Sequence, residues 1–93
     1  MIKSFAEKET EQVYRGEVAR KFPPDIQRTA RRKLIYLNEA NTLSDLLAPP
    51  GNRLEALKGN RSGQPSIRIT EQWRIVFRWE QPHAYAVGIT DYH

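Results

Sequence analysis

Residues 73–79 read WRIVFRW, a stretch in which large apolar side chains alternate with Arg74, Val76 and Arg78. A period of two is typical of a β-strand that has one face in the core and the other face turned outward. We therefore expect a strand over Trp73–Trp79, with the apolar side chains in the core and the cationic ones on the opposite face.

The segments around this strand predict an antiparallel meander. After a turn at residues 81–83, the alternation resumes in Tyr85, Val87 and Ile89, which repeats the core-facing pattern. The predicted elements upstream are strands at Leu54–Lys58 and Ser66–Thr70, a loop at 59–63 and a turn at 71–72. Because short turns join these strands, we expect consecutive strands to pair antiparallel.

The N-terminal half shows helical spacing instead. Ile26, Ala30, Leu34 and Leu37 recur at intervals of four, four and three, which places them on one stripe of a helix. We expect a short strand at Ile2–Phe5 and a helix capped by Ser4 and Glu7 that reaches about Tyr14 and ends at Gly16. A second helix is expected from Pro24 to about Glu39, followed by a short turn at Thr42–Leu47 that ends at residues 49–52. Helices first and strands last indicate an α+β fold with the helices on one face of the sheet.

Size and composition exclude several classes of protein. A chain of 93 residues suits one domain, because each of two domains would lack a sufficient core. The absence of cysteine excludes disulfide scaffolds, thiolate zinc sites and cysteine nucleophiles, and two histidines are too few for a histidine-rich metal site. No signal peptide or apolar run of membrane-spanning length is found, so we expect a cytoplasmic protein.

The charge indicates a polyanionic partner, since the formal net charge is +4 and the isoelectric point is about 9.7. Strand parity places several cations and small residues on the sheet face turned away from the helices, called the open face below: Arg68, Arg74, Arg78, Ala86, Gly88, Thr90 and Tyr92. Guanidinium groups around a shallow floor can bind a phosphodiester backbone through bidentate contacts. The alternative is an ordinary solvated sheet face.

Asp91, Tyr92 and His93 bring a carboxylate, a phenol and an imidazole to the end of a strand. RNA cleavage by attack of the 2′-hydroxyl on the adjacent phosphate requires a base, an acid and a nearby positive charge. His93 can act as acid or base near neutral pH, while Arg74 and Lys58 can provide the charge. These residue types together favour a nuclease.

His83 is too distant to complete a two-histidine site. It falls in the predicted last turn, and ten residues of strand place it about 30 Å from His93. We expect His83 to be a solvated turn residue. The second proton-transfer group is then Tyr92, Asp91 or Glu55, and the sequence leaves these three open.

Four ordered motifs, LKGNRSG at 57–63, SIRI at 66–69, QWRIVF at 72–77 and DYH at 91–93, resemble HigB-type toxins of the RelE superfamily. The opening MIKSF also fits, so the resemblance covers the whole chain. The stretch PPGNRLEAL at 49–57 is most similar to the HigB-like subgroup that includes the GraT toxin.

The resemblance implies a RelE-like single domain, with N-terminal helices on one face of a twisted, mainly antiparallel sheet. It also implies a ribosome-dependent mRNA endonuclease that needs no metal or cofactor. The implied partners are the ribosome, mRNA and a helix-turn-helix antitoxin of the HigA type, through which alone the chain would reach operator DNA.

The resemblance further implies roles for individual residues. The implied active-site set is Lys58, Arg74, Asp91, Tyr92 and His93, with Glu55 at a position where some HigB toxins have a second histidine. We expect Arg61, Arg68 and Arg78 to bind RNA, and the helical Arg28, Arg31 and Arg32 to contact ribosomal RNA phosphates.

Structural roles and other functions remain as alternatives. Arg74 can instead pair with Asp91 or Glu55, Lys58 can be a plain strand-end residue, and Tyr92 can border the core rather than stack on a base. Among the functions, the chain can block translation by binding RNA or the ribosome without cutting, or act with its antitoxin as a corepressor.

Overall fold

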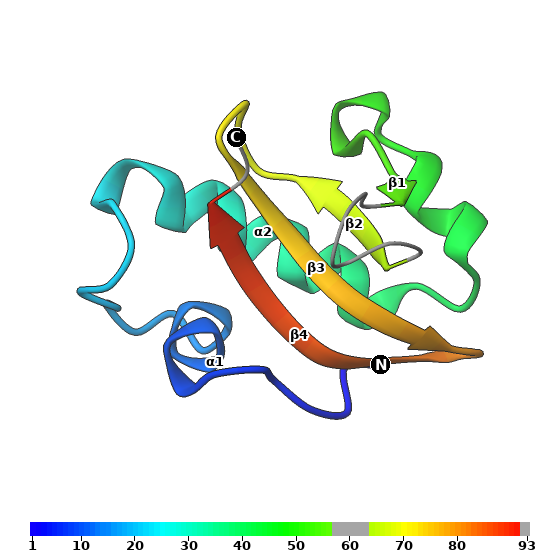
Figure 1. The fold of residues 1–93 in the computed structure, drawn as a ribbon, viewed down its shortest axis with the longest axis horizontal. Helices are drawn as coiled ribbons and strands as arrows, with labels where there is room; N and C mark the ends of the chain where they lie inside the picture. The colour runs from blue at the N-terminus through cyan, green and yellow to red at the C-terminus, as the bar shows by residue number, and fades with distance from the viewer. Residues whose placement is uncertain (57–63, 92–93) are drawn as a thin grey trace.

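The computed structural model describes residues 1–56 and 64–91. Its centre is a twisted four-stranded antiparallel sheet in which the strands follow chain order (Figure 1). The strands are β1 (Glu55–Ala56), β2 (Pro65–Arg68), β3 (Trp73–Glu80) and β4 (His83–Asp91). The predicted meander is confirmed, and β3 covers the predicted Trp73–Trp79 with one more residue.

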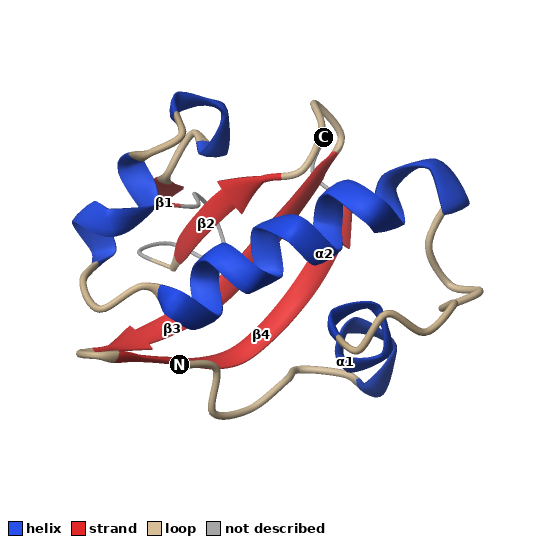
Figure 2. Cartoon of the chain, turned by 180° about the vertical axis from the view of Figure 1, so that it is seen from behind, coloured by secondary structure: helices blue, strands red, loops and turns tan. Residues whose placement is uncertain are grey.

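In the described residues, two α-helices and two short 3₁₀ helices accompany the sheet. They are α1 (Lys8–Tyr14), α2 (Pro24–Glu39), η1 (Leu43–Leu47) and η2 (Pro50–Asn52). The long helix has the predicted bounds, with Pro24 in the first turn where no amide partner is lost. It lies across one face of the sheet, and α1 packs against α2 and β4 (Figure 2). The predicted α+β class is confirmed.

The predicted apolar stripe of α2 forms the helical side of the core. Ile26, Ala30, Leu34 and Leu37 are all buried, and the sheet faces them with buried side chains that include Ile75. The other buried residues of this cluster from the strands, and from the turn that follows β2, are Ile67, Ile69, Phe77, Ala84, Val87 and Ile89. Complete burial of one such aliphatic or aromatic side chain stabilises the fold by about 1.5–3 kcal/mol.

The N-terminal segment pairs with the sheet but differs from the predictions. In place of a strand over Ile2–Phe5, two isolated parallel bridges join Ile2 to Ala84 and Phe5 to Val87. The predicted capping box is also wrong, because α1 begins at Lys8 with Glu7 as its N-cap. Ser4 has another partner, since its Oγ accepts a hydrogen bond of 2.8 Å from the Ala86 amide.

A bulge in β4 explains why Ala86 needs that partner. The register passes from Val76 opposite Gly88 to Arg78 opposite Tyr85, so that two residues of β4 stand against one of β3. Ala86 has a φ of 51°, in the left-handed region. The bulge reverses the parity of the strand, and the predicted core orientation of Tyr85 is therefore wrong. Its ring lies on the open face, 5.1 Å from the guanidinium carbon of Arg78.

The remaining boundaries differ by a few residues. Leu54 precedes β1, while 57 and 58 lie outside the described residues. The second strand ends at Arg68 rather than Thr70, because the amides of Ile69 and Thr70 both turn toward the Trp73 carbonyl. The helix end at Gly16 is confirmed, with a φ of 82° there. Within the described ranges, no helix has the length and apolar character needed to cross a membrane.

Candidate active site on the open sheet face

The side chain of Arg74 belongs to the open face of the sheet but is buried there and does not project into solvent. Its side chain is only 5% exposed. Nε donates to Ser66 Oγ at 2.8 Å, and Nη2 donates to the Ser66 carbonyl at 3.2 Å and to the Arg53 carbonyl. The register, with Arg74 between Arg68 and Thr90, confirms the predicted face, and the guanidinium is buried within that face. The segment that follows η2 supplies one of its acceptors.

Ser66 links this guanidinium to Glu55. Its hydroxyl accepts from Arg74 Nε and donates to the Glu55 carbonyl at 3.2 Å, and the residue is fully buried. The structure thereby brings Glu55, Ser66 and Arg74 together on three adjacent strands. Sequence reasoning missed Ser66, although the alternation of β2 already placed it on the same face as Arg68.

Asp91 lies at the same end of the sheet as Arg74. It is the last described residue, pairs with Trp73, and its Oδ2 accepts a hydrogen bond of 3.0 Å from Gln72 Nε2. Thr90, its neighbour, pairs with Arg74. The other predicted site residues, Lys58, Arg61, Tyr92 and His93, lie outside the described residues.

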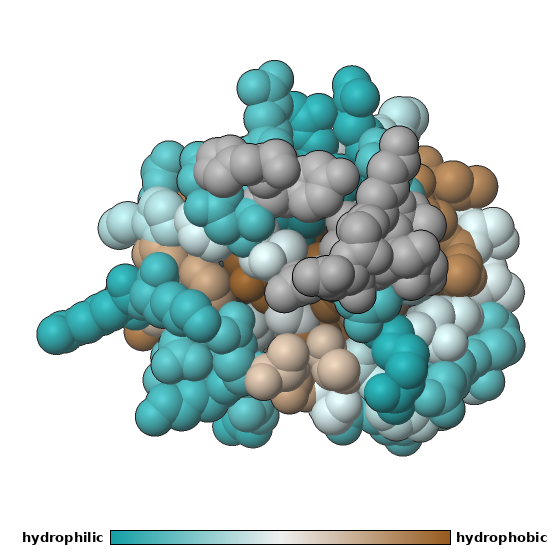
Figure 3. All heavy atoms as spheres, viewed as in Figure 1, coloured by the Kyte–Doolittle hydropathy of each residue, from teal (hydrophilic) through white to brown (hydrophobic). Residues whose placement is uncertain are grey.

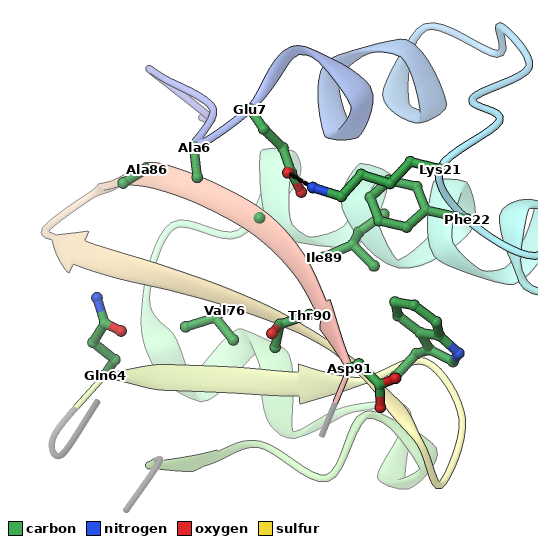
Figure 4. Close-up of a pocket in the computed structure, with 12 residues that line it drawn as sticks. Ala6, Glu7, Lys21, Phe22, Gln64, Val76, Ala86, Ile89, Thr90 and Asp91 are labelled. Atoms are coloured by element: carbon green, nitrogen blue, oxygen red, sulfur yellow. Dashed lines mark hydrogen bonds and ion pairs between the residues drawn. The ribbon is translucent and has the colours of Figure 1, made fainter. Parts of the chain in front are cut away.

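A groove of about 550 Å³ runs along β4 beside these residues (Figure 4). It is lined by Ala6, Glu7, Lys21, Phe22, Gln64, Trp73, Val76, Ala86, Gly88, Ile89, Thr90 and Asp91. Its floor contains the small residues predicted for the open face. A side chain at Gly88 would crowd this region, because an added Cβ would lie 3.2 Å from the Cβ of Ala6. In the space-filling view from this side, hydrophilic residues surround a more apolar centre (Figure 3).

The wall of the groove is fixed by an ion pair and an aromatic pair. Lys21 Nζ donates to Glu7 Oε2, and this hydrogen bond, together with the carboxylate charge, raises the pKa of Lys21 (Figure 4). Phe22 and Trp73 meet edge to face, with ring centroids 5.8 Å apart. Trp73 belongs to the partly buried residues packed on the core, in agreement with its predicted structural role.

Arg68 and Arg78 are each paired with a neighbouring carboxylate. Arg68 Nη2 lies 3.7 Å from Glu71 Oε1, and Arg78 Nε lies 2.8 Å from Glu80 Oε2. Such pairs at the surface contribute little stability, so the guanidinium groups can exchange partners readily. Arg68 is the cross-strand neighbour of Arg74, whereas Arg78 lies about 13 Å further along β3.

The three arginines of α2 form a separate cationic surface. Arg28, Arg31 and Arg32 are exposed and line a shallow hollow on the outer side of the helix, on the other side of the sheet from the open face (Figure 2). Arg31 has a structural contact as well, because its Nε donates to the carbonyl of Tyr14 at the end of α1, at 3.2 Å. A positive charge at a helix C-terminus is stabilising.

Lys33 is a buried lysine that sequence reasoning missed. It is 4% exposed, and its Nζ donates to Asn52 Oδ1 at 2.5 Å. Burial lowers the pKa of Lys33, and the charges of Arg32 and Arg68 lower it further. The signal was present in the spacing, because a residue three after Ala30 lies on the buried stripe of α2.

His83 differs from its prediction as a solvated turn residue. It is the first residue of β4, partly buried, and its Nδ1 is buried without a hydrogen-bond partner in the described part of the chain. Desolvation lowers the pKa of His83, with a smaller contribution from the charge of Lys3. The described residues contain no group of three histidine or acidic side chains placed to hold a metal ion.

Comparisons with known proteins agree on one family. A family model described as the RelE-like toxin of type II toxin-antitoxin system HigB matches residues 3–93. The chain is 42% identical over 80 residues to Toxin HigB-1 of Vibrio cholerae serotype O1, which covers 85% of this chain and 84% of that protein. It is 31% identical to Endoribonuclease HigB of Proteus vulgaris over an alignment of 97 positions that includes all of both chains.

Proposed function

The chain belongs to the family of HigB-like, RelE-like toxins of type II toxin-antitoxin systems, and from this premise we propose that it is a ribosome-dependent mRNA endonuclease that inhibits translation. The endonuclease activity is the one that the name of the Proteus vulgaris relative states for that protein. The requirement for the ribosome and the chemistry below go beyond the names of the relatives.

The proposed reaction is an internal transfer on RNA. The 2′-oxygen forms a bond to the adjacent phosphorus while the bond from phosphorus to the 5′-oxygen breaks. A base takes the proton of the 2′-hydroxyl and an acid protonates the departing oxygen. His93 serves as one of these groups, and Tyr92, Asp91 or Glu55 as the other. Lys58 and Arg74 stabilise the negative charge that develops on the phosphate.

The observation that carries this proposal is the fixed position of Arg74. Three hydrogen bonds to Ser66 and Arg53 hold the guanidinium beside Glu55 and near the end of β4 where Asp91 lies. Burial removes water from around the positive charge, so its attraction for an anion is screened less than at the surface. A cation already in place costs no reorganisation during the reaction.

The cationic surfaces suggest how RNA and ribosome are bound. We propose that Arg61, Arg68 and Arg78 contact the mRNA backbone, Arg68 and Arg78 from the open face. The opposite, outer surface of α2 would then contact ribosomal RNA through Arg28, Arg31 and Arg32. Two surfaces on opposite sides of the molecule allow both contacts at once.

Membership in a toxin-antitoxin system implies an antitoxin partner. We propose a helix-turn-helix antitoxin of the HigA type that neutralises the toxin in the cytoplasm. In this proposal the chain reaches operator DNA only through that antitoxin.

Primer-extension mapping of a reporter mRNA tests the function. The wild-type protein should cut within translated codons when ribosomes are present and leave free mRNA intact. Arg74→Ala should lower the cleavage rate about 10²–10³-fold and His93→Ala about 10²–10⁴-fold. Arg74→Lys, which keeps the charge, controls for loss of folding.

Retained cleavage in both alanine variants would refute the site. Intact mRNA with blocked translation would indicate a binding inhibitor instead. Operator binding with the antitoxin as the sole activity would indicate a corepressor.

A further inference from the structure

Lys33 occupies a position that an apolar residue would fill at lower cost. It lies on the buried stripe of α2, 4% exposed, and within residues 1–56 and 64–91 its amine contacts the Asn52 carboxamide and lies 6.0 Å from the Tyr36 ring centroid. Removing an ammonium group from water is strongly unfavourable, and one hydrogen bond to a neutral amide offsets it only in part. A lysine at this position therefore suggests a role other than stability.

Asn52 is the residue that Lys33 holds in place. The carboxamide is fully buried, and its Nδ2 donates to the carbonyls of Leu46 and Ala48 at 3.2 and 3.3 Å. An ammonium group can only donate, so it requires the oxygen of the amide to face Lys33 and leaves the nitrogen for the two carbonyls. The pair thus ties the segment between η1 and η2 to the middle of α2.

This segment leads directly to Arg74. Arg53, the next residue, has a φ of 44°, and its amide donates to the Pro50 carbonyl at 3.2 Å. The left-handed conformation reverses the chain after η2, and the Arg53 carbonyl accepts a hydrogen bond from Arg74 Nη2. A continuous series of contacts therefore joins Lys33 and Asn52 to the guanidinium.

We propose that Lys33 and Asn52 are positioning residues, which set the orientation of the Arg74 guanidinium through the Arg53 carbonyl. The inference rests on the proposed function of Arg74 and deepens it. Neither residue touches the substrate. Removal of either side chain keeps the positive charge of Arg74. The N–H groups of the guanidinium, however, are no longer held in the orientation that the transition state requires.

The first measurement follows Arg74 itself and needs no substrate. In a ¹⁵N-labelled protein, the Nε–H signal of Arg74, assigned by its absence in Arg74→Lys, reports the hydrogen bond to Ser66. Lys33→Met keeps the volume and is apolar, so it should fold. Lys33→Met and Asn52→Ala should each accelerate hydrogen exchange at Nε about tenfold or more. Asn38→Ala is the matched control, since it removes a carboxamide that accepts from the Ile2 amide at 2.9 Å.

The second measurement is the single-turnover cleavage of mRNA on ribosomes. At saturating substrate, Lys33→Met and Asn52→Ala should lower the rate constant about 10- to 100-fold, with an unchanged half-saturating concentration. The double variant should be no slower than the slower single variant, because both substitutions act through one carbonyl. Asn38→Ala should match wild type in both measurements.

Four outcomes separate the inference from the proposed function. Cleavage at the wild-type rate in both variants would overturn the positioning role but not the proposed nuclease activity. A change in the half-saturating concentration alone, with an unchanged rate constant, would have the same meaning. Unchanged exchange at Arg74 Nε would overturn it as well. A wild-type protein that cuts no RNA would instead overturn the proposed function, and the positioning role with it.

Discussion

A single hydroxyl, that of Ser66, connects three strands of the sheet. It accepts from the Arg74 guanidinium and donates to the Glu55 carbonyl, in a position with no exposure to solvent. Ser66→Ala removes both bonds and leaves a charged donor and a carbonyl without this hydroxyl. The variant should therefore lose about 1.5–3 kcal/mol of unfolding free energy. Urea denaturation measures the loss.

Ser44→Ala is the control for this substitution. Ser44 is exposed and its hydroxyl bonds only to Thr42 within the part of the chain that the structure describes, so its removal should change stability by less than about 0.5 kcal/mol. Equal stabilities of the two variants would show that the Ser66 bonds contribute nothing.

His83 predicts a dependence of stability on pH. Its folded-state pKa lies below the ordinary value of 6.5, so between these two values the unfolded chain binds a proton that the folded chain does not. Stability is therefore retained above the ordinary pKa and falls as the pH decreases below it. In the described part of the chain, the charges that lower the pKa of His83 further are those of Lys3 and the Met1 amine, while Glu80, the cross-strand partner of His83, pairs with Arg78.

Thermal unfolding of wild type and His83→Gln between pH 5 and 8 tests this dependence. As the pH falls, the unfolding temperature of wild type should decrease more than that of His83→Gln. Protonation of carboxylates lowers the stability of both proteins equally and does not affect this difference. Parallel curves would mean that His83 titrates equally in the folded and unfolded chains.

For Arg74 and Lys33, the sequence predicts the face on which each residue lies but not its contacts. The period of two fixed the strand and face of Arg74, but its burial depends on the Arg53 carbonyl, 21 positions earlier in the chain. The period of the helix placed Lys33 on the buried stripe, where a charged residue type argued against burial. Contacts between elements that are distant in sequence decide both cases.

At the scale of the element, the bulge in β4 depends on an alanine in a conformation that favours glycine. With a φ of 51°, Ala86 has a steric cost that a residue without Cβ avoids. Ala86→Gly should raise the unfolding free energy by about 0.5–1 kcal/mol, after the loss of backbone entropy is included. Ala84→Gly, in the regular and buried part of β4, should lower it instead. If Ala86→Gly and Ala84→Gly both lower the unfolding free energy, the backbone at Ala86 is not strained.

The bulge also explains where the prediction of β4 failed. Alternation in Tyr85, Val87 and Ile89 assumes an unbroken period of two, and nothing in these residue types announces an extra residue. The predicted helix cap at Ser4 failed for a related reason. Ser4 and Glu7 have the spacing of a capping box, but the Ser4 hydroxyl accepts a hydrogen bond from the Ala86 amide at the bulge instead. The long helix, whose signals are all local, was predicted to run from Pro24 to about Glu39, which agrees with the structure.

For the whole molecule, two separate cationic surfaces predict a distinct pattern of salt dependence. Arg28→Ala and Arg32→Ala on α2 should weaken association with ribosomes and reduce the slope of log K against log salt by about 0.7 for each phosphate that is no longer neutralised. Both residues are exposed, so folding stability should change little. Filter binding over a range of salt concentrations measures the slope.

Arg15→Ala provides the control, since this exposed arginine at the end of α1 pairs with Glu11. It should leave the slope unchanged. Equal effects of all three substitutions would indicate attraction by net charge alone rather than contact by α2.

The order of helices and strands made the overall class predictable, but not the way in which the chain closes on itself. Periodicity reports the face of each element and turn residues report its ends. Neither reports that Ile2 and Phe5 pair with β4, because isolated bridges have no repeating pattern.

That closure has a consequence for the growing polypeptide. The Ser4 hydroxyl and the Ala86 amide meet across 82 positions, so every nascent chain too short to include β4 lacks the partner of the segment around Ser4. Closing a loop of this length is entropically costly and comes late in folding. The segment around Ser4 is synthesised well before β4, yet it is among the last to be fixed, because it acquires its partner only after β4 has left the ribosome.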